Sequence, residues 1–176
     1  INELFGSFGW TYQPMLLLIT LPIGISFYTF HGLSYVIDIY NDKIKAEKNV
    51  LNYSLFVCFF PLLVAGPIER AQHLIPQLVR KKVFNRAQTI NGLQQMLWGF
   101  FKKIVIADNC AVFVNQIFSD YENLNSSSLF IGAIFFSFQI YGDFSGYSDI
   151  AIGLALLVGY RLKENFENPY NSTNIT

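Results

Sequence analysis

Three long stretches of the chain contain no charged residue, and they constrain the fold more than any other feature of the sequence. They run from residue 4 to 37, from 49 to 68 and from 123 to 142. A stretch of about 18 or more residues with few charges is typical of a transmembrane helix. Three such stretches in a chain of 176 residues predict an all-α protein that passes through a membrane several times.

The overall composition argues against two other classes of protein. Charged residues make up 14% of the chain, whereas a soluble domain has about 25% and needs them to cover its surface. The 12 Lys and Arg residues are balanced by 12 Asp and Glu residues, so no net positive field attracts nucleic acid, and we expect no nucleic-acid partner. Cys58 and Cys110 lie among apolar residues and indicate neither a disulfide framework nor a metal site.

The first two apolar segments differ in length. Residues 14–39 would form a helix of about 39 Å, longer than a hydrocarbon core of about 30 Å, and Pro22 with Gly24 marks the expected break. Residues 50–66 are short for a full span and have basic residues on both sides. By the positive-inside rule both flanks favour the cytoplasm, so a re-entrant hairpin and a full crossing both stay open.

Two further segments are expected to be helical. Residues 84–118 predict one or two helices, the first amphipathic, with Lys102 and Lys103 extending to the cytoplasmic interface. A polar, acidic loop follows at residues 119–128, on the far side of the membrane. Residues 129–162 would be about 51 Å long as one helix. We therefore expect a break between Gly142 and Asp149.

This expected break contains the most informative residues of the chain. Ionisable groups inside an apolar span are costly unless they are paired or hydrated, and they often mark functional sites. Two interpretations stay open: the acids face a substrate, or they only cap helix ends and contact neighbouring helices. The candidates for the wall of a polar substrate tunnel are Tyr141, Asp143, Ser145, Tyr147, Ser148 and Asp149.

Three residues are secondary candidates. His31, in an aromatic span, is more typical of a histidine that is hydrogen-bonded within a helix bundle. Glu69 and Arg70 follow a Gly-Pro turn and could shape a donor entrance, but exposed charges on a surface turn are the favoured interpretation. No catalytic triad or metal-ligand spacing is present in the sequence, so we expect no metal.

An ordered set of segments resembles the membrane-bound O-acyltransferase family, and within it the alginate O-acetyltransferase-like bacterial branch. The match extends over nearly the whole chain in family order, and it is strongest from Gln139 to Gly153. Any one segment is a weak signal, whereas the ordered set is specific. The matching segments are residues 21–30, 34–40, 60–61, 65–68, 99–109, 139–153, 164–166 and 168–170.

The resemblance implies a fold and a position within it. The expected fold is a ring of transmembrane and re-entrant helices around a tunnel. Residues 1–176 would be part of that single domain, truncated at both ends. The family's histidine is expected beyond Thr176, after the Asn-Pro-Tyr segment at residues 168–170. No catalytic residue is therefore assigned in this chain, and the fragment alone is expected to be inactive.

The resemblance also implies an activity. The full-length protein would transfer an acetyl or other acyl group from a cytoplasmic donor, acetyl-CoA or an acyl-carrier thioester, towards hydroxyls of an exported polysaccharide such as alginate. It would lie in the bacterial cytoplasmic (inner) membrane, contact lipid, hold no bound cofactor and work with a periplasmic or extracellular partner. Two alternatives stay open: a channel or transporter with a binding site at a broken helix, and a non-catalytic membrane scaffold.

Overall fold

The computed structural model describes residues 24–165, and within that range it is helical and contains no strand. The all-α expectation is therefore confirmed. The elements in chain order are α2 (Ile25–Tyr40), α3 (Val50–Val57), the 3-10 helix η1 (Phe60–Leu62), α4 (Ala71–Val79), α5 (Arg86–Phe100), the π-helix η2 (Phe101–Ala107), α6 (Asp108–Ser119) and α7 (Ser126–Leu157).

Three helices begin directly after an asparagine whose side chain caps the helix. The Oδ1 atoms of Asn49, Asn85 and Asn125 accept hydrogen bonds from backbone N–H groups two or three residues further on, at 2.9, 3.2 and 2.9 Å. The first N–H groups of a helix have no partner within the helix, and an asparagine at this position satisfies one of them. These asparagines set the starts of α3, α5 and α7.

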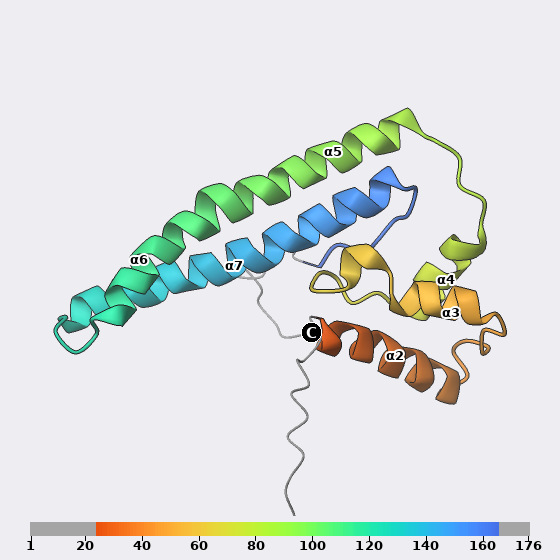
Figure 1. The fold of residues 1–176 in the computed structure, drawn as a ribbon, viewed down its shortest axis with the longest axis horizontal. Coiled ribbons are helices and arrows are strands. Elements are labelled where there is room, and N and C mark those ends of the chain that lie inside the picture. The colour runs from red at the N-terminus through yellow and green to blue at the C-terminus, as the bar shows by residue number, and fades with distance from the viewer. Residues whose placement is uncertain (1–23, 166–176) are drawn as a thin grey trace, which may run out of the picture.

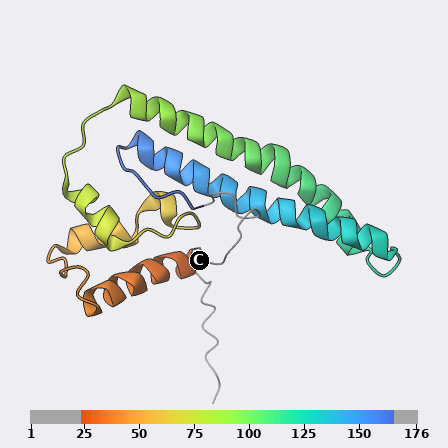
Figure 2. The ribbon, with the colours of Figure 1, turned by 180° about the vertical axis from the view of Figure 1, so that it is seen from behind.

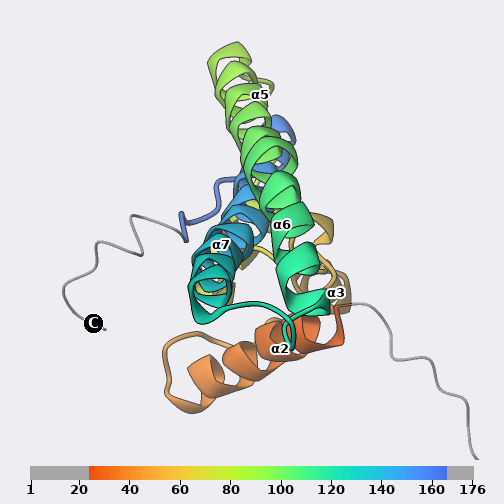
Figure 3. The same ribbon diagram turned by 90° about the vertical axis from the view of Figure 1, so that its left-hand side faces the viewer.

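The longest part of the structure is a hairpin of two antiparallel helical arms. The first arm joins α5, η2 and α6 without interruption, and α7 runs back beside it (Figure 1). Seen from the hairpin end, α7 lies directly against α5 and α6 (Figure 3). The predicted helical segment at residues 84–118 and the polar loop after it are both confirmed, with the turn at residues 120–125.

The two arms approach closely because glycines face one another between them. A Cβ atom built on Gly99 would lie 2.6 Å from the carbonyl oxygen of Gly146, and one on Gly92 would lie 2.7 Å from that of Gly153. Real side chains do not tolerate such distances, so only glycine fits at this glycine interface (Gly92, Gly99, Gly146 and Gly153). Small residues allow helices in membranes to pack in this way.

The break expected between Gly142 and Asp149 is wrong, because α7 is one helix of 32 residues. Its length is about 48 Å, more than a hydrocarbon core of about 30 Å requires, so a straight helix must tilt or extend beyond the core. The glycines that suggested a break instead face the first arm, Gly142 at η2 and Gly146 at α5, and the acidic side chains have cationic partners on the same arm. Neither feature requires the helix to be interrupted.

The N-terminal lobe (α2, α3, η1 and α4) lies beside the C-terminal half of α7 (Figures 1 and 2). Helix α2 begins directly after Gly24, whose φ is +81° and where a Cβ atom would lie 1.9 Å from the carbonyl oxygen of Leu63. The predicted break at Gly24 is thus a helix start, while residues 14–23 lie outside the described range. Helix α3 is about 12 Å long, too short to cross a membrane, which favours the re-entrant alternative for residues 50–66.

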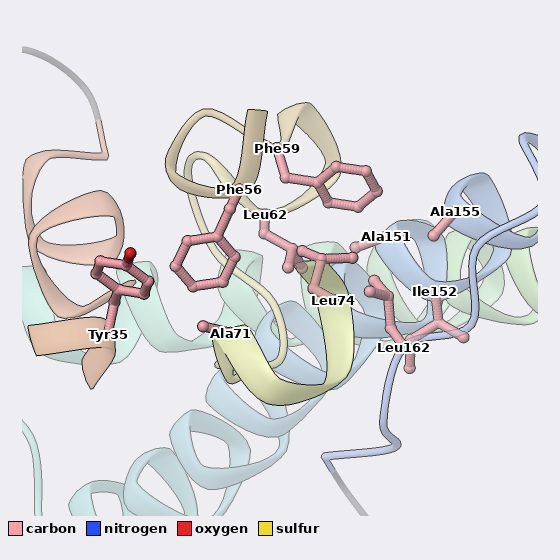
Figure 4. Packing of buried hydrophobic residues seen from close by; sticks show 10 residues of the cluster. All are labelled: Tyr35, Phe56, Phe59, Leu62, Ala71, Leu74, Ala151, Ile152, Ala155 and Leu162. Atoms are coloured by element: carbon pink, nitrogen blue, oxygen red, sulfur yellow. The ribbon is translucent and has the colours of Figure 1, made fainter. Parts of the chain in front are cut away.

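A hydrophobic cluster joins this lobe to the hairpin. Phe56 and Leu74 are fully buried, and Leu62 is almost so. Leu62 and Leu74 lie beside Ala151 on α7, while Phe56 lies on the side of Tyr35 (Figure 4). The cluster therefore fixes the position of the lobe against the part of α7 that carries the acidic residues.

The surface of the hairpin is the reverse of that of a soluble helical protein. The buried residues of α7 are mostly glycine, alanine and serine, whereas its large apolar residues, such as Phe130, Phe138 and Phe144, are exposed. Large exposed apolar areas mark surfaces that contact a membrane or another protein. Within residues 24–165, α7 is the one helix long and apolar enough to cross a membrane.

The glycine interface can be tested by adding a methyl group to it. Gly153→Ala places a Cβ atom 2.5 Å from the carbonyl oxygen of Gly92, and we expect the free energy of unfolding to fall by about 1–3 kcal/mol. Gly32→Ala is the matched control, since its Cβ atom would meet only the hydroxyl of Tyr53 at 3.7 Å. Thermal unfolding of the full-length protein in detergent measures both, and equal stability of the two variants would contradict the packing.

Candidate functional site

A buried ion pair joins the two arms of the hairpin. The Nζ atom of Lys102 lies 2.6 Å from Oδ2 of Asp149 and donates a hydrogen bond to Oγ of Ser145, also at 2.6 Å. The amide of Gln95 donates to the other oxygen of Asp149 at 2.7 Å. The side chains of Lys102 and Asp149 are only 11% and 13% exposed. Both charges are therefore largely removed from water and matched by specific partners.

The expectation that Lys102 extends to the membrane interface is wrong, and the local backbone shows why. Lys102 and Lys103 lie in the π-helix η2. In a π-helix each N–H group bonds to the carbonyl oxygen five residues back, whereas in an α-helix it bonds to the one four residues back. The N–H group of Asp108 donates to the carbonyl oxygen of Lys103, five residues back. Both lysines reach acidic groups on α7, and the glycine interface brings α7 within range of them. Single-turn π-helical bulges are frequent at functional sites.

A second ionic group lies next to the first, on the side of the polar loop. Lys103 contacts both Asp143 and Asp108, each at 2.6 Å. All three side chains are more than one-third exposed, so water weakens their attraction. Both predicted acids of α7 thus have lysine partners, but only Asp149 is largely buried.

A pocket of about 270 Å³ lies beside the buried ion pair. The hydroxyl of Ser148 is buried in its wall and has no hydrogen-bond partner among the described residues. Polar groups from both arms and from the segment after α7 meet here. The pocket is lined by Gln95, Trp98, Lys102, Ser148, Asp149, Ile152, Glu164 and Asn165.

The structure brings together part of the predicted tunnel wall. Ser145 contacts Lys102, and both Ser148 and Asp149 line the pocket. The ring of Tyr141 lies 5.8 Å from the Lys102 ammonium. Tyr147 instead packs against the hydrophobic cluster.

The secondary candidates lie apart from the pocket, in or beside the N-terminal lobe, and each has different contacts. The surface-turn interpretation is wrong for Glu69, which is completely buried. Its carboxylate contacts Nδ1 of His73 at 2.8 Å and accepts a hydrogen bond from the backbone N–H of Lys163. Arg70 is exposed and lies 3.4 Å from Asp38.

His31 is buried in the same lobe, away from the pocket lining. It is 1% exposed, and its ring centre lies 5.7 Å from that of Phe56. Its Nε2 atom has no hydrogen-bond partner in the part of the chain that the structure describes. Hydrogen bonding of this nitrogen within the bundle is thus not observed.

The segment after α7 turns back towards the N-terminal lobe. Gly159, with φ of +88°, ends the helix, and the ammonium of Lys82 lies 4.0 Å from the centre of the Tyr160 ring. Burial lowers the pKa of Lys82 below its ordinary value, and the positive charge of Arg80 lowers it further.

Sequence reasoning missed the cationic and amide side of the site. Lys102, Gln95 and Trp98 come from the first arm, and Glu164 and Asn165 come from the segment after α7. An acid inside an apolar span requires a partner, and two adjacent lysines in an apolar helix were the available signal. Within residues 24–165 no group of acidic, cysteine or histidine side chains is arranged to hold a metal ion.

Comparison with known proteins identifies relatives over the whole chain. A probable alginate O-acetylase of Pseudomonas aeruginosa is 43% identical over 182 aligned residues, covering 100% of this chain and 33% of that protein. A peptidoglycan O-acetyltransferase of Helicobacter pylori is 35% identical, with 88% of this chain and 34% of that protein covered. The chain is homologous to the alginate O-acetylases. The resemblance to the alginate branch of the membrane-bound O-acyltransferases is therefore confirmed.

More distant relatives transfer a different acyl group. A teichoic acid D-alanyltransferase of Bacillus subtilis is 25% identical over 159 aligned residues, covering 87% of this chain and 39% of that protein. No family model matches the chain. The chain spans about a third of the length of the alginate O-acetylases that it matches.

The buried pair and the exposed group are expected to differ in their effect on stability. Lys102→Met leaves Asp149 buried without its cation, and we expect the free energy of unfolding to fall by about 3 kcal/mol. Lys103→Met removes contacts that are open to water and should cost about 1 kcal/mol or less. Unfolding of the full-length variants in detergent, followed by tryptophan fluorescence, compares them. A larger loss for Lys103→Met would show that the ion pair is not buried in the protein.

Proposed function

We propose that the full-length protein transfers an acetyl or related acyl group to a hydroxyl of an exported polysaccharide. The observation that carries this proposal is the identity of 43% to a probable alginate O-acetylase over the whole of this chain. Relatives named for peptidoglycan and teichoic acid are less similar, at 35% and 25%. This order favours an alginate-like acceptor over cell-wall polymers.

The proposed location is the bacterial cytoplasmic membrane, with several crossings that form part of a ring around a tunnel. The long apolar helix α7 and the exposed aromatic residues of the hairpin support a lipid-facing surface. The basic connection at residues 80–86 lies at one end of the hairpin, and the acidic loop at residues 120–125 lies at the other (Figure 1). The positive-inside rule favours the cytoplasm for the basic end.

The pocket lies nearer to this basic end. Asp149 is eight residues, or about 12 Å, from the C-terminal end of α7. A donor that arrives from the cytoplasm, acetyl-CoA or an acyl-carrier thioester, would therefore reach the pocket through the shorter part of the membrane. We propose that a periplasmic or extracellular partner receives the acyl group on the other side.

The polar centre suits substrate positioning better than base catalysis. Lys102 is held by Asp149, and both carboxylate oxygens of Asp149 already accept hydrogen bonds. Fixed donors stabilise the negative charge that develops on oxygen during acyl transfer only if they reach the reacting atoms. In this proposal Lys102 and Ser148 provide donors at the pocket wall, while the base comes from outside residues 1–176.

The alternative of a channel or transporter with a broken-helix site is not favoured. It depended on an interruption of the helix between Gly142 and Asp149, and α7 is continuous there. The relatives are acyltransferases by name rather than channels or scaffolds.

The proposal is tested with labelled acetyl donor and membranes that contain the full-length protein. We expect Asp149→Asn to lower acetyl transfer about tenfold, which corresponds to about 1.4 kcal/mol of transition-state stabilisation. Asp120→Asn is the matched control because Asp120 is exposed in the turn of the hairpin. Normal acetyl transfer by Asp149→Asn, at equal amounts of protein in the membrane, would show that the pocket takes no part in the reaction. Absence of any transfer by the unmodified protein would reject the activity itself.

A further inference from the structure

The N-terminal lobe holds the chain that leaves α7 at three consecutive points. We define the return segment as residues 159–165. Gln77, on α4, forms two hydrogen bonds to the backbone of Arg161, accepting from its N–H and donating to its carbonyl oxygen, each at 2.9 Å. Glu69 accepts a hydrogen bond from the N–H of Lys163. Between them, Leu162 enters the hydrophobic cluster (Figure 4).

The path of the return segment begins with a defined helix end. The N–H of Tyr160 donates to the carbonyl oxygen of Ala155 at 2.8 Å, and Gly159 adopts the left-handed conformation. This is the Schellman arrangement, which terminates a helix and reverses the chain. The Lys82 side chain packs against Gly159 and the Tyr160 ring. The segment is thus directed back towards α4 before Gln77 and Glu69 engage it.

The attachment has a direct consequence for the candidate site. Glu164 and Asn165 follow Lys163 immediately, and both line the pocket beside Lys102 and Asp149. Their position depends on the backbone at Arg161 and Lys163, because no secondary structure holds residues 161–165. Neither Gln77 nor Glu69 lines the pocket itself.

We infer that Gln77 and Glu69 are positioning residues, which hold the return segment so that Glu164 and Asn165 close one wall of the substrate pocket. This inference deepens the proposed function and rests on it for the identity of the substrate. The two residues contribute in different ways. Gln77 recognises the backbone through a planar amide that both donates and accepts, so glutamate in its place keeps only the acceptor. Glu69 is fully buried, and its second oxygen contacts His73 at 2.8 Å, which orients the carboxylate towards Lys163.

The first experiment does not depend on enzyme activity. In the full-length protein with Cys58 and Cys110 replaced by serine and Leu162→Cys introduced, the reaction rate with a maleimide reports how tightly the return segment is held, because Leu162 is buried in the hydrophobic cluster. We expect Gln77→Ala to raise this rate about fivefold, because two hydrogen bonds of ordinary strength are lost. Gln77→Glu should raise the rate at least as much, because a carboxylate oxygen would face the carbonyl oxygens of Arg161 and His73. Gln72→Ala, exposed on the same helix, is the matched control. Equal rates for Gln77→Ala, Gln72→Ala and the parent would overturn the inference.

The second experiment measures acyl transfer. We expect Gln77→Ala to raise the KM for the acceptor about fivefold with kcat nearly unchanged, and Gln77→Glu to raise it at least as much. Glu69→Gln keeps an acceptor for the N–H of Lys163 and should have a smaller effect than Gln77→Ala. If the labelling rate changes but no variant or parent transfers acetyl groups, the positioning role stands and the proposed activity fails. If the KM is unchanged while labelling rises, the wall is held as described but does not contact the substrate.

Discussion

The contact between the glycine faces of α5 and α7 is the constraint on which the rest of the structure depends. With no side chains between Gly99 and Gly146, the two backbones touch, and a lysine one turn further along reaches across to the other helix. Removing two charges from water costs several kcal/mol, which is recovered only when the pair is well placed and its other hydrogen bonds are made. Ser145 and Gln95 supply those bonds to Lys102 and Asp149. The packing and the polar centre therefore stabilise each other.

This arrangement follows the physics of a lipid-facing protein rather than that of a soluble domain. Lipid tails are as apolar as leucine, so burying leucine between helices gains little, whereas close backbone contact gains van der Waals energy. The hairpin accordingly keeps glycine and serine inside and directs phenylalanine and isoleucine outwards. An intact helix also satisfies its own backbone groups, which a broken one in lipid does not. The polar centre is thus formed by side chains of two unbroken arms.

The elements of the fold could largely be predicted from the sequence, whereas the partners in the site could not. A charge-free stretch locates the first half of α7, and the helical pattern of residues 84–118 predicts the first arm, because these signals are local. The acids of α7 are also a local signal. The amphipathic pattern of residues 84–118, however, predicts that their partners Lys102 and Lys103 extend to the membrane interface. Hairpin geometry held part of the missing information: Gly92 with Gly153, and Gly99 with Gly146, lie at equal distances from the turn. The same count places Lys102 opposite Asp143, whereas its partner is Asp149, further along α7. The burial of Glu69 had no such signal, since its partner Lys163 is 94 residues away.

Asp149 and Glu69 have different tasks. They are connected through the return segment, which follows α7 and is contacted by Glu69 at Lys163. Asp149 is held between rigid helices, so its geometry is determined by the packing of the hairpin. Glu69 holds an irregular segment, and the geometry it controls is that of Glu164 and Asn165 in the pocket wall. A wall built on hydrogen bonds to loop backbone opens at lower free energy than one built on packed helices. Under the proposed function, the N-terminal lobe governs the adjustable side of the pocket, the hairpin fixes the charged side, and a substrate enters without disturbing the buried ion pair.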